Sequence, residues 1–176
     1  SRLVGSEMCI RDRCVALSSG TSAVMYSLIN IMSQGDNFIS ASQLYGGTYT
    51  MFDNILPEYG INAKKVDITD FKAVEESIDE KTRAIYCETI TNPGLVVADL
   101  TALSEIAHAN GIPLIVDATF TTSAIQKSFD FGADIVVYSL TKWMSGHGRV
   151  IAGAVIEKGG FDWGNGNFPL YDKPDT

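Results

Sequence analysis

Short apolar and β-branched runs alternate along the chain with segments whose apolar residues recur every three or four positions. In residues 21–32, Val24, Leu28, Ile31 and Met32 share one face of a helix. This alternation is typical of β-α-β units and predicts a three-layer α/β/α protein whose mostly parallel sheet is covered on both faces. Strands are expected at residues 37–41, 62–66, 82–86, 113–116, 135–138 and 150–156, and further helices at 70–77 and 100–110.

Capping residues support two of these helix boundaries. Asp70 and Asp99 stand where a side-chain oxygen can accept the first free N–H groups of a helix. Gly111 follows the helix expected at 100–110 and can end it in a left-handed conformation.

The two ends of the chain lack the alternating pattern. Residues 1–13 mix charged and isolated apolar residues, and we expect them to be a non-native or artefactual leader, with a genuine frayed segment as the alternative. Residues 159–176 are rich in Gly, Asn, Pro and Asp and stop inside a loop-like stretch. We therefore expect residues 14–176 to be a partial domain.

Composition narrows the class of protein. The 176 residues are 45% hydrophobic with a formal net charge of −8, which suits one folded domain without a membrane span and disfavours a nucleic-acid partner. Cys9, Cys14 and Cys87 follow neither disulfide nor zinc spacing. His108 and His147 are the only histidines and lie far apart. We expect a reducing cytoplasm and no metal site.

A lysine lies where open α/β sheets place their ligand sites. Lys142 follows the strand expected at 135–138, in the turn that begins with Ser139 and Thr141. A lysine there can attack a carbonyl carbon if its pKa is lowered, and the two hydroxyls can bind an anion. A solvated loop lysine beside capping hydroxyls is the alternative.

Three further features add to this candidate site. Asp117 ends the apolar strand at 113–116, where a buried carboxylate needs a cationic partner such as a protonated pyridine nitrogen; a turn or capping Asp is the alternative. The Ser-Ser-Gly-Thr stretch at 18–21 precedes a helix and can cradle a phosphate or simply cap that helix. Tyr45 precedes two glycines and can stack on a flat cofactor, or pack as an ordinary core or surface tyrosine.

Several common site motifs do not occur in the sequence. The glycine spacing matches neither the dinucleotide-binding G-x-G-x-x-G nor a P-loop. A serine hydrolase is also disfavoured, because G-x-S-x-G is absent.

Five motifs in order resemble the trans-sulfuration (Cys/Met metabolism) family of pyridoxal-phosphate (PLP) enzymes. They are S-S-G-T, Y-G-G-T, E-T-I-T-N-P, I-V-D-A-T-F and S-L-T-K-W-M-S-G-H-G, and the resemblance covers residues 14–174. It implies the large domain of an aspartate-aminotransferase-like, fold type I enzyme, truncated here and without the C-terminal small domain. Within the family, residues 159–169 are most similar to the O-acetylhomoserine sulfhydrylase branch.

The resemblance implies a role for each motif residue around the cofactor ring. Lys142 would bind the cofactor covalently and then transfer protons at the α and β carbons of the substrate. Asp117 would pair with the pyridinium nitrogen, and Asn92 would hydrogen-bond the phenolic oxygen. Tyr45 would stack on one face of the ring, and Thr119 would pack against the other.

The remaining motif residues would hold the cofactor phosphate. The resemblance assigns Ser139 and Thr141 to this group, together with the backbone N–H groups of Gly20 and Thr21. Glu88 belongs to the same motif as Asn92, without a defined role.

The resemblance implies a transferase that replaces the γ-acetoxy group of O-acetylhomoserine with sulfide or a thiol, giving homocysteine or methionine, in a cytoplasmic homo-oligomer. Gly47 stands where the methionine lyase branch typically carries Cys, which favours substitution over elimination. A carbon–sulfur lyase of the methionine γ-lyase or cystathionine lyase type, and a catalytically silent fragment, are the alternatives. The family's N-terminal Tyr and Arg and its substrate-binding Arg are not found in this sequence.

Overall fold

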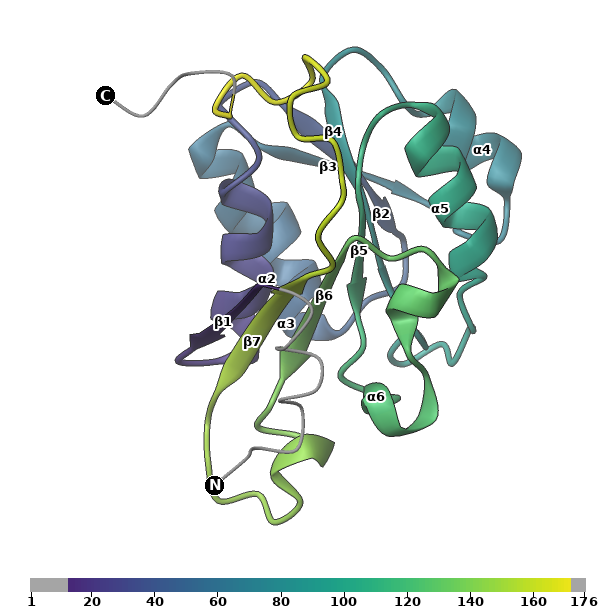
Figure 1. Cartoon of the computed structure of the whole chain (residues 1–176). Helices are drawn as coiled ribbons and strands as arrows, with labels where there is room; N and C mark the ends of the chain where they lie inside the picture. The colour runs from purple at the N-terminus through teal and green to yellow at the C-terminus, as the bar shows by residue number, and fades with distance from the viewer. Residues whose placement is uncertain (1–12, 172–176) are drawn as a thin grey trace.

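A computed structural model describes residues 13–171; residues 1–12, where most of the expected leader falls, lie outside the described residues. The described part contains one sheet with the strand order β1-β7-β6-β5-β4-β2-β3 (Figure 1). Strands β2 to β6 pair in parallel, and β7 runs antiparallel between β6 and β1. The mostly parallel sheet expected from the sequence is therefore confirmed. The strands are β1 (Arg13–Leu17), β2 (Asn37–Ala41), β3 (Asn62–Val66), β4 (Thr82–Glu88), β5 (Leu114–Asp117), β6 (Ile135–Ser139) and β7 (Gly153–Glu157).

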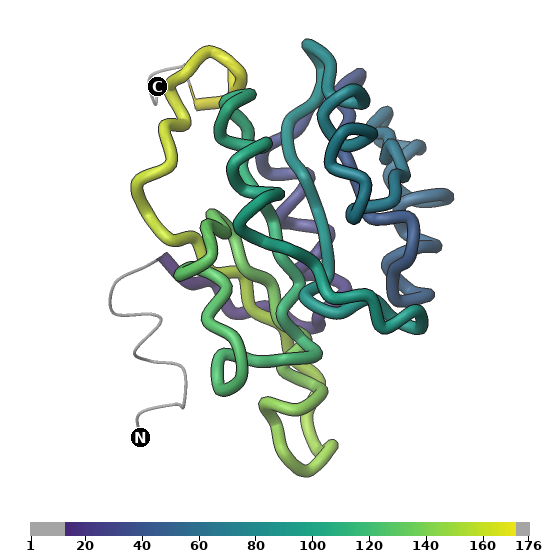
Figure 2. Tube along the Cα trace, turned by 90° about the vertical axis from the view of Figure 1, so that its right-hand side faces the viewer, coloured from purple at the N-terminus to yellow at the C-terminus, as the bar shows by residue number. Residues whose placement is uncertain are grey.

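Helices cover both faces of the sheet, with α2 and α3 on one side and α4 and α5 on the other (Figures 1 and 2). The side chains of Asp70 and Asp99 cap α4 and α5, as expected, by accepting the backbone N–H groups of Ala73 and Ala102. No helix of the described residues is long and apolar enough to cross a membrane. The helices are α2 (Gly20–Ile29), α3 (Gly46–Thr50), α4 (Phe71–Glu76), α5 (Leu100–Ala109) and α6 (Thr122–Ile125), with short turns η1 (Met51–Ile55), η2 (Leu56–Tyr59), η3 (Ser128–Phe131) and η4 (Trp143–Ser145).

The central strands β4, β5 and β6 shift by one or two residues at their ends, and two larger differences from the sequence prediction concern β1 and β7. Strand β1 was not predicted; Arg13, the last residue of the expected leader, pairs with Glu157 at the start of this strand. Its burial follows no strict alternation, because β1 lies at the edge of the sheet. Strand β7 begins at Gly153 instead of residue 150, since the apolar residues before it lie in an exposed loop.

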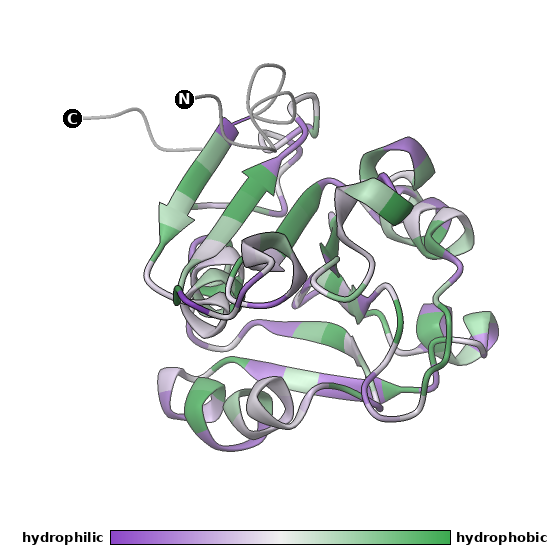
Figure 3. Ribbon diagram, turned by 90° about the horizontal axis from the view of Figure 1, so that it is seen from below, coloured by the Kyte–Doolittle hydropathy of each residue, from purple (hydrophilic) through white to green (hydrophobic). Residues whose placement is uncertain are grey.

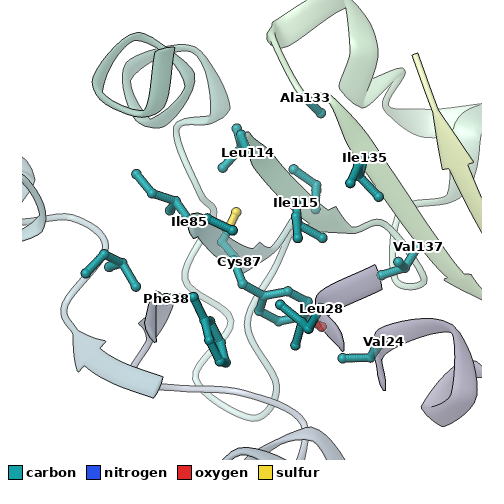
Figure 4. Packing of buried hydrophobic residues seen from close by; sticks show 14 of the residues in the cluster. Val24, Leu28, Phe38, Ile85, Cys87, Leu114, Ile115, Ala133, Ile135 and Val137 are labelled. Atoms are coloured by element: carbon teal, nitrogen blue, oxygen red, sulfur yellow. The ribbon is translucent and has the colours of Figure 1, made fainter. Parts of the chain in front are cut away.

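The core lies between the sheet and its helices. Figure 4 shows Val24 and Leu28 of α2 below the strands, on the same side as Phe38 of β2. The ring of Phe52 meets the rings of Phe38 and Tyr86 edge-on, at 4.8 and 5.1 Å between centroids. Figure 3 shows hydrophobic segments along the strands with helices on either side. Each such fully buried large side chain contributes roughly 1.5–3 kcal/mol, which fixes the position of the strand ends that form the site.

Candidate functional site

A cavity of about 740 Å³ lies at the carboxyl ends of β4, β5 and β6. This is the edge of a parallel sheet where chain segments leave the strands and ligands usually bind. All the residues that the sequence motifs assign to cofactor binding line this cavity, although they come from distant parts of the chain. They are Gly20, Thr21, Tyr45, Asn92, Asp117, Thr119, Ser139, Thr141 and Lys142.

Strand register places the two carboxylates of the cavity side by side. Glu88 and Asp117 are the last residues of β4 and β5 and are direct partners across this parallel pair. Asp117 is in turn the register partner of Val137 in β6, two residues before the strand leads into the turn that carries Lys142. The parallel arrangement therefore brings these groups to one end of the sheet.

Asp117 is a partly buried carboxylate with only uncharged donors. Its Oδ1 accepts the backbone N–H of Thr119 at 2.9 Å, and its Oδ2 accepts the hydroxyl of Tyr86 at 3.5 Å. Burial raises the pKa of Asp117, because desolvation outweighs these hydrogen bonds. Among residues 13–171, no Lys, Arg or His side chain forms an ion pair with it. Such a carboxylate at a cavity wall fits a ligand that presents a cationic nitrogen.

Lys142 and Tyr45 face the cavity from two different loops. The Nζ of Lys142 lies 5.9 Å from the centroid of the Tyr45 ring, and both side chains are exposed. Gly47 is essential for this position of the ring, because a Cβ at Gly47 would lie 2.8 Å from Cε1 of Tyr45. A larger residue at position 47 would therefore force the tyrosine ring to move.

The start of α2 offers free donors to the cavity. As the first two residues of the helix, Gly20 and Thr21 have N–H groups without an intrahelical acceptor, at its positive end. The side chain of Ser19 accepts the N–H of Ser22 at 3.0 Å and leaves these two groups available. A Cβ at Gly20 would lie 2.4 Å from the Cβ of Ser139, so only glycine allows this close approach. This cradle fits an anion such as a phosphate.

The hydroxyls beside the cradle are already engaged to different degrees. The Oγ1 of Thr119 accepts the backbone N–H of Ser139 at 2.7 Å. The hydroxyl of Thr141 donates to the carbonyl of Ala152 at 3.2 Å and accepts its N–H at 3.1 Å. Thr141 must therefore give up a backbone hydrogen bond before it can donate to an anion, a constraint that the motif does not reveal.

Several cavity residues were not assigned a role from the sequence. The carboxylate of Glu88 accepts the backbone N–H of Tyr45 at 2.7 Å and that of Asn92 at 3.1 Å. Burial raises the pKa of Glu88 to about 7. The sequence signal for a role of Glu88 was its position at the end of an apolar strand. The others, all but Val24 and Ile151 within the five motifs, are Ser19, Val24, Thr48, Ile90, Phe120, Trp143, Gly146, Gly148 and Ile151.

The segment at 159–169 lies away from the cavity. The side-chain amides of Asn165 and Asn167 donate to the carbonyl of Gly111 at 2.8 and 3.1 Å, just after α5. Phe161 and Phe168 pack with Trp163, and none of these residues lines the cavity. Figures 1 and 2 show this segment, in yellow, at the opposite end of the sheet from the loop that follows β6.

The fold and the cavity define the class of protein. A mostly parallel α/β sheet of this kind is shared with solved fold type I PLP enzymes. A Campylobacter jejuni protein described as an O-acetylhomoserine (thiol)-lyase carrying a pyridoxyl-lysine monophosphate superposes with a TM-score of 0.89 at 35% identity, over 92% of this chain and 40% of its own. Cystathionine γ-lyase from Lactobacillus plantarum, complexed with L-serine, gives a TM-score of 0.81 at 37% identity, over 87% of this chain and 40% of its own.

The chain belongs to the Cys/Met metabolism PLP-dependent enzyme family, whose model matches residues 6–171. Homocysteine synthase of Schizosaccharomyces pombe is 44% identical over 163 residues, which are 91% of this chain and 38% of the relative. O-acetyl-L-homoserine sulfhydrylase of Leptospira meyeri is 42% identical over 161 residues, 92% of this chain and 36% of the relative. The chain thus spans less than two fifths of the length of these two relatives.

Proposed function

We propose that the natural-length protein containing this sequence is a PLP-dependent transferase that replaces the γ-acetoxy group of O-acetylhomoserine with sulfide or a thiol. The observation that carries this proposal is one cavity that combines the amine of Lys142, the partly buried carboxylate of Asp117 and the free N–H groups at the start of α2. The names of the sulfhydrylase relatives support the choice of substrate.

The donors and acceptors of the cavity fit the three polar ends of PLP. Asp117 faces the cavity without a cationic partner among the described residues, and a protonated pyridine nitrogen would supply one. Gly20 and Thr21 would hold the phosphate through their N–H groups, with Ser139 beside them. Lys142 would bind the aldehyde carbon through Nζ.

PLP, when bound, supplies an electron sink for charge that develops on the carbons next to the substrate amine. The carboxylate of Asp117 would hold a proton on the ring nitrogen and thereby keep that sink effective. The ring of Tyr45 would orient the cofactor from one face. The amine of Lys142 would accept and return protons at the substrate carbons as a general base and acid. Trp143 and Ile151 line the cavity beside Lys142.

Absorbance tests the role of Lys142. The chain mixed with PLP is expected to develop the long-wavelength band of lysine-bound cofactor, and Lys142→Ala is expected to abolish it, because no other lysine among residues 13–171 lines the cavity. Lys72→Ala, which removes an exposed lysine of α4 that pairs with Glu76, is the matched control and should keep the band. An unchanged band in Lys142→Ala would refute the assignment.

The reaction is tested with the natural-length protein. Homocysteine should form from O-acetylhomoserine only when sulfide is added. Elimination without any need for sulfide would favour the lyase alternative, which the likeness to cystathionine γ-lyase supports. Gly47 favours the transferase, because the resemblance places a Cys at this position in the methionine lyase branch.

We also propose that the natural-length protein is a homo-oligomer. Trp143, Val150 and Ile151 are exposed apolar residues of the loop between β6 and β7, and their burial between subunits would stabilise an assembly. Light scattering measures its mass.

A further inference from the structure

The carboxylate of Glu88 joins two loops that are far apart in the sequence. It is the last residue of the fully buried strand β4 and is 6% exposed, yet it lines the cavity. Its Oε1 accepts the backbone N–H of Tyr45, at the start of α3, at 2.7 Å. Its Oε2 accepts the backbone N–H of Asn92, in the loop after β4, at 3.1 Å. Both oxygens are therefore used, one by each loop.

We propose that Glu88 is a positioning residue that holds the Tyr45 loop and the Asn92 loop together, and so fixes both side chains at the cavity. The inference rests on the proposed function in one respect, namely that these two side chains contact the cofactor. The connection between the loops is itself independent of any ligand. Tyr45 has no side-chain cap at the start of α3, so the bond from its N–H to Glu88 is what anchors this end of the short helix.

A carboxylate of this length is required for the connection. Glutamine offers one acceptor oxygen, and its NH₂ group would face the second N–H donor, so Glu88→Gln can keep only one of the two loops. Aspartate is shorter by one methylene group and cannot reach both N–H groups from the same backbone position. A buried N–H that loses its acceptor becomes an unpaired donor, so each substitution should destabilise the position of the loop that it releases.

Protonation of Glu88 would weaken the connection in the same way as the Glu88→Gln substitution, because one of the two oxygens would then carry a hydrogen and face an N–H donor. Burial raises the pKa of Glu88 to about 7, against the opposing effect of the two N–H donors. The titratable groups that interact with it are Asp117 of β5 and Tyr86 and Cys87 of β4, and Tyr45 and Lys142 line the same cavity. The negative charge of Asp117 raises the pKa further. The ionised, doubly accepting form therefore prevails only above neutral pH.

Amide NMR of the chain without cofactor tests the connection. In the wild type, the amide signals of Tyr45 and Asn92 are expected to titrate together, with a midpoint near pH 7, from about pH 5 to about pH 9. In Glu88→Gln neither signal should titrate in this range. At high pH, at least one of the two signals should lie away from its position in the wild type. Glu105→Gln, on the exposed side of α5, is the matched control and should behave as the wild type. Independent titration of the two signals in the wild type, or amide signals in Glu88→Gln that coincide with those of the wild type at high pH, overturns the proposal.

Cofactor affinity tests the positioning role. The dissociation constant for PLP, measured by absorbance titration at about pH 8, should rise roughly tenfold in Glu88→Gln and in Glu88→Asp, and stay unchanged in Glu105→Gln. Unchanged affinity in Glu88→Gln, with the amide signals displaced, would overturn positioning. If the wild type fails to bind PLP while both amides titrate with Glu88, the connection stands and the proposed function fails.

Discussion

At the scale of single residues, the cavity holds two neighbouring acidic groups that the described chain leaves without a cationic partner. Glu88 and Asp117 face each other across β4 and β5, and burial raises the pKa of both. Backbone N–H groups satisfy both oxygens of Glu88, whereas Asp117 keeps one oxygen for a long bond from Tyr86. Glu88 is thus suited to hold loops, and Asp117 to receive a cation.

Glu88 should make stability depend on pH. The pKa of Glu88 rises from 4.5 to about 7 on folding, so folding favours its protonated form. The resulting contribution to the free energy of unfolding is complete below pH 4.5 and is lost as the pH rises through 7. Glu88→Gln stays uncharged at every pH. As the pH rises through this range, the free energy of unfolding of the variant should therefore increase relative to that of the wild type by up to about 3 kcal/mol. Urea unfolding at several pH values measures the difference. Parallel pH profiles for the two proteins would contradict the expectation.

At the scale of elements, the position of α2 depends on a glycine in β7. A Cβ at Gly153 would lie 2.0 Å from the carbonyl oxygen of Ser19 and 3.0 Å from the backbone N of Gly20. These are backbone atoms, so no side-chain rotation relieves the contact. The absence of a side chain in β7 therefore lets the start of the helix reach the carboxyl end of the sheet.

Gly153→Ala should displace the start of α2 and disturb the anion cradle. We expect a loss of about 1–3 kcal/mol in the free energy of unfolding, as for other overpacked positions, together with weaker PLP binding. Chemical denaturation and absorbance titration measure the two effects. Gly164→Ala is the control, because a Cβ there meets only Oδ1 of Asp162 at 3.6 Å. Full stability and full affinity in Gly153→Ala would show that α2 is not held in this way.

At the scale of the whole molecule, the candidate site and the segment at 159–169 lie at opposite ends of the sheet. The cavity lies at the carboxyl ends of the parallel strands, and the segment at 159–169 packs near the end of α5 on the opposite side (Figure 1). The segment therefore contributes to packing next to α5, and none of its residues lines the cavity. It makes no contact with the cavity that could select a substrate.

Removal of both amides in Asn165→Ala/Asn167→Ala should affect stability alone. The loss of hydrogen bonds to the carbonyl of Gly111 should lower the free energy of unfolding by about 2 kcal/mol, at about 1 kcal/mol for each side chain. PLP affinity should stay unchanged, because the segment is remote from the cavity. Denaturant unfolding and absorbance titration provide the test, with exposed Asn54→Ala as the control. A fall in PLP affinity would show that the two ends are coupled.

The pattern of residues predicted much of this architecture because the forces involved are local. Apolar periodicity and the capping carboxylates of Asp70 and Asp99 act within a few residues, so the central strands and two helix starts could be located. Strand β1 could not, because an edge strand with one neighbour has a weak burial pattern. The loop before β7 was misassigned to the strand, because exposed Val150 and Ile151 have the same β-branched character as core residues.

The sequence by itself determined which residue types stand at the ends of apolar strands, and hence that Lys142, Asp117 and the Ser-Gly-Thr turn were candidates for one site. Only the tertiary structure decided that Glu88 connects two loops and that Gly153 makes room for α2. These contacts join positions tens of residues apart, and they exist because strand order and register, set by packing of the whole sheet, bring those backbones within hydrogen-bonding or van der Waals distance.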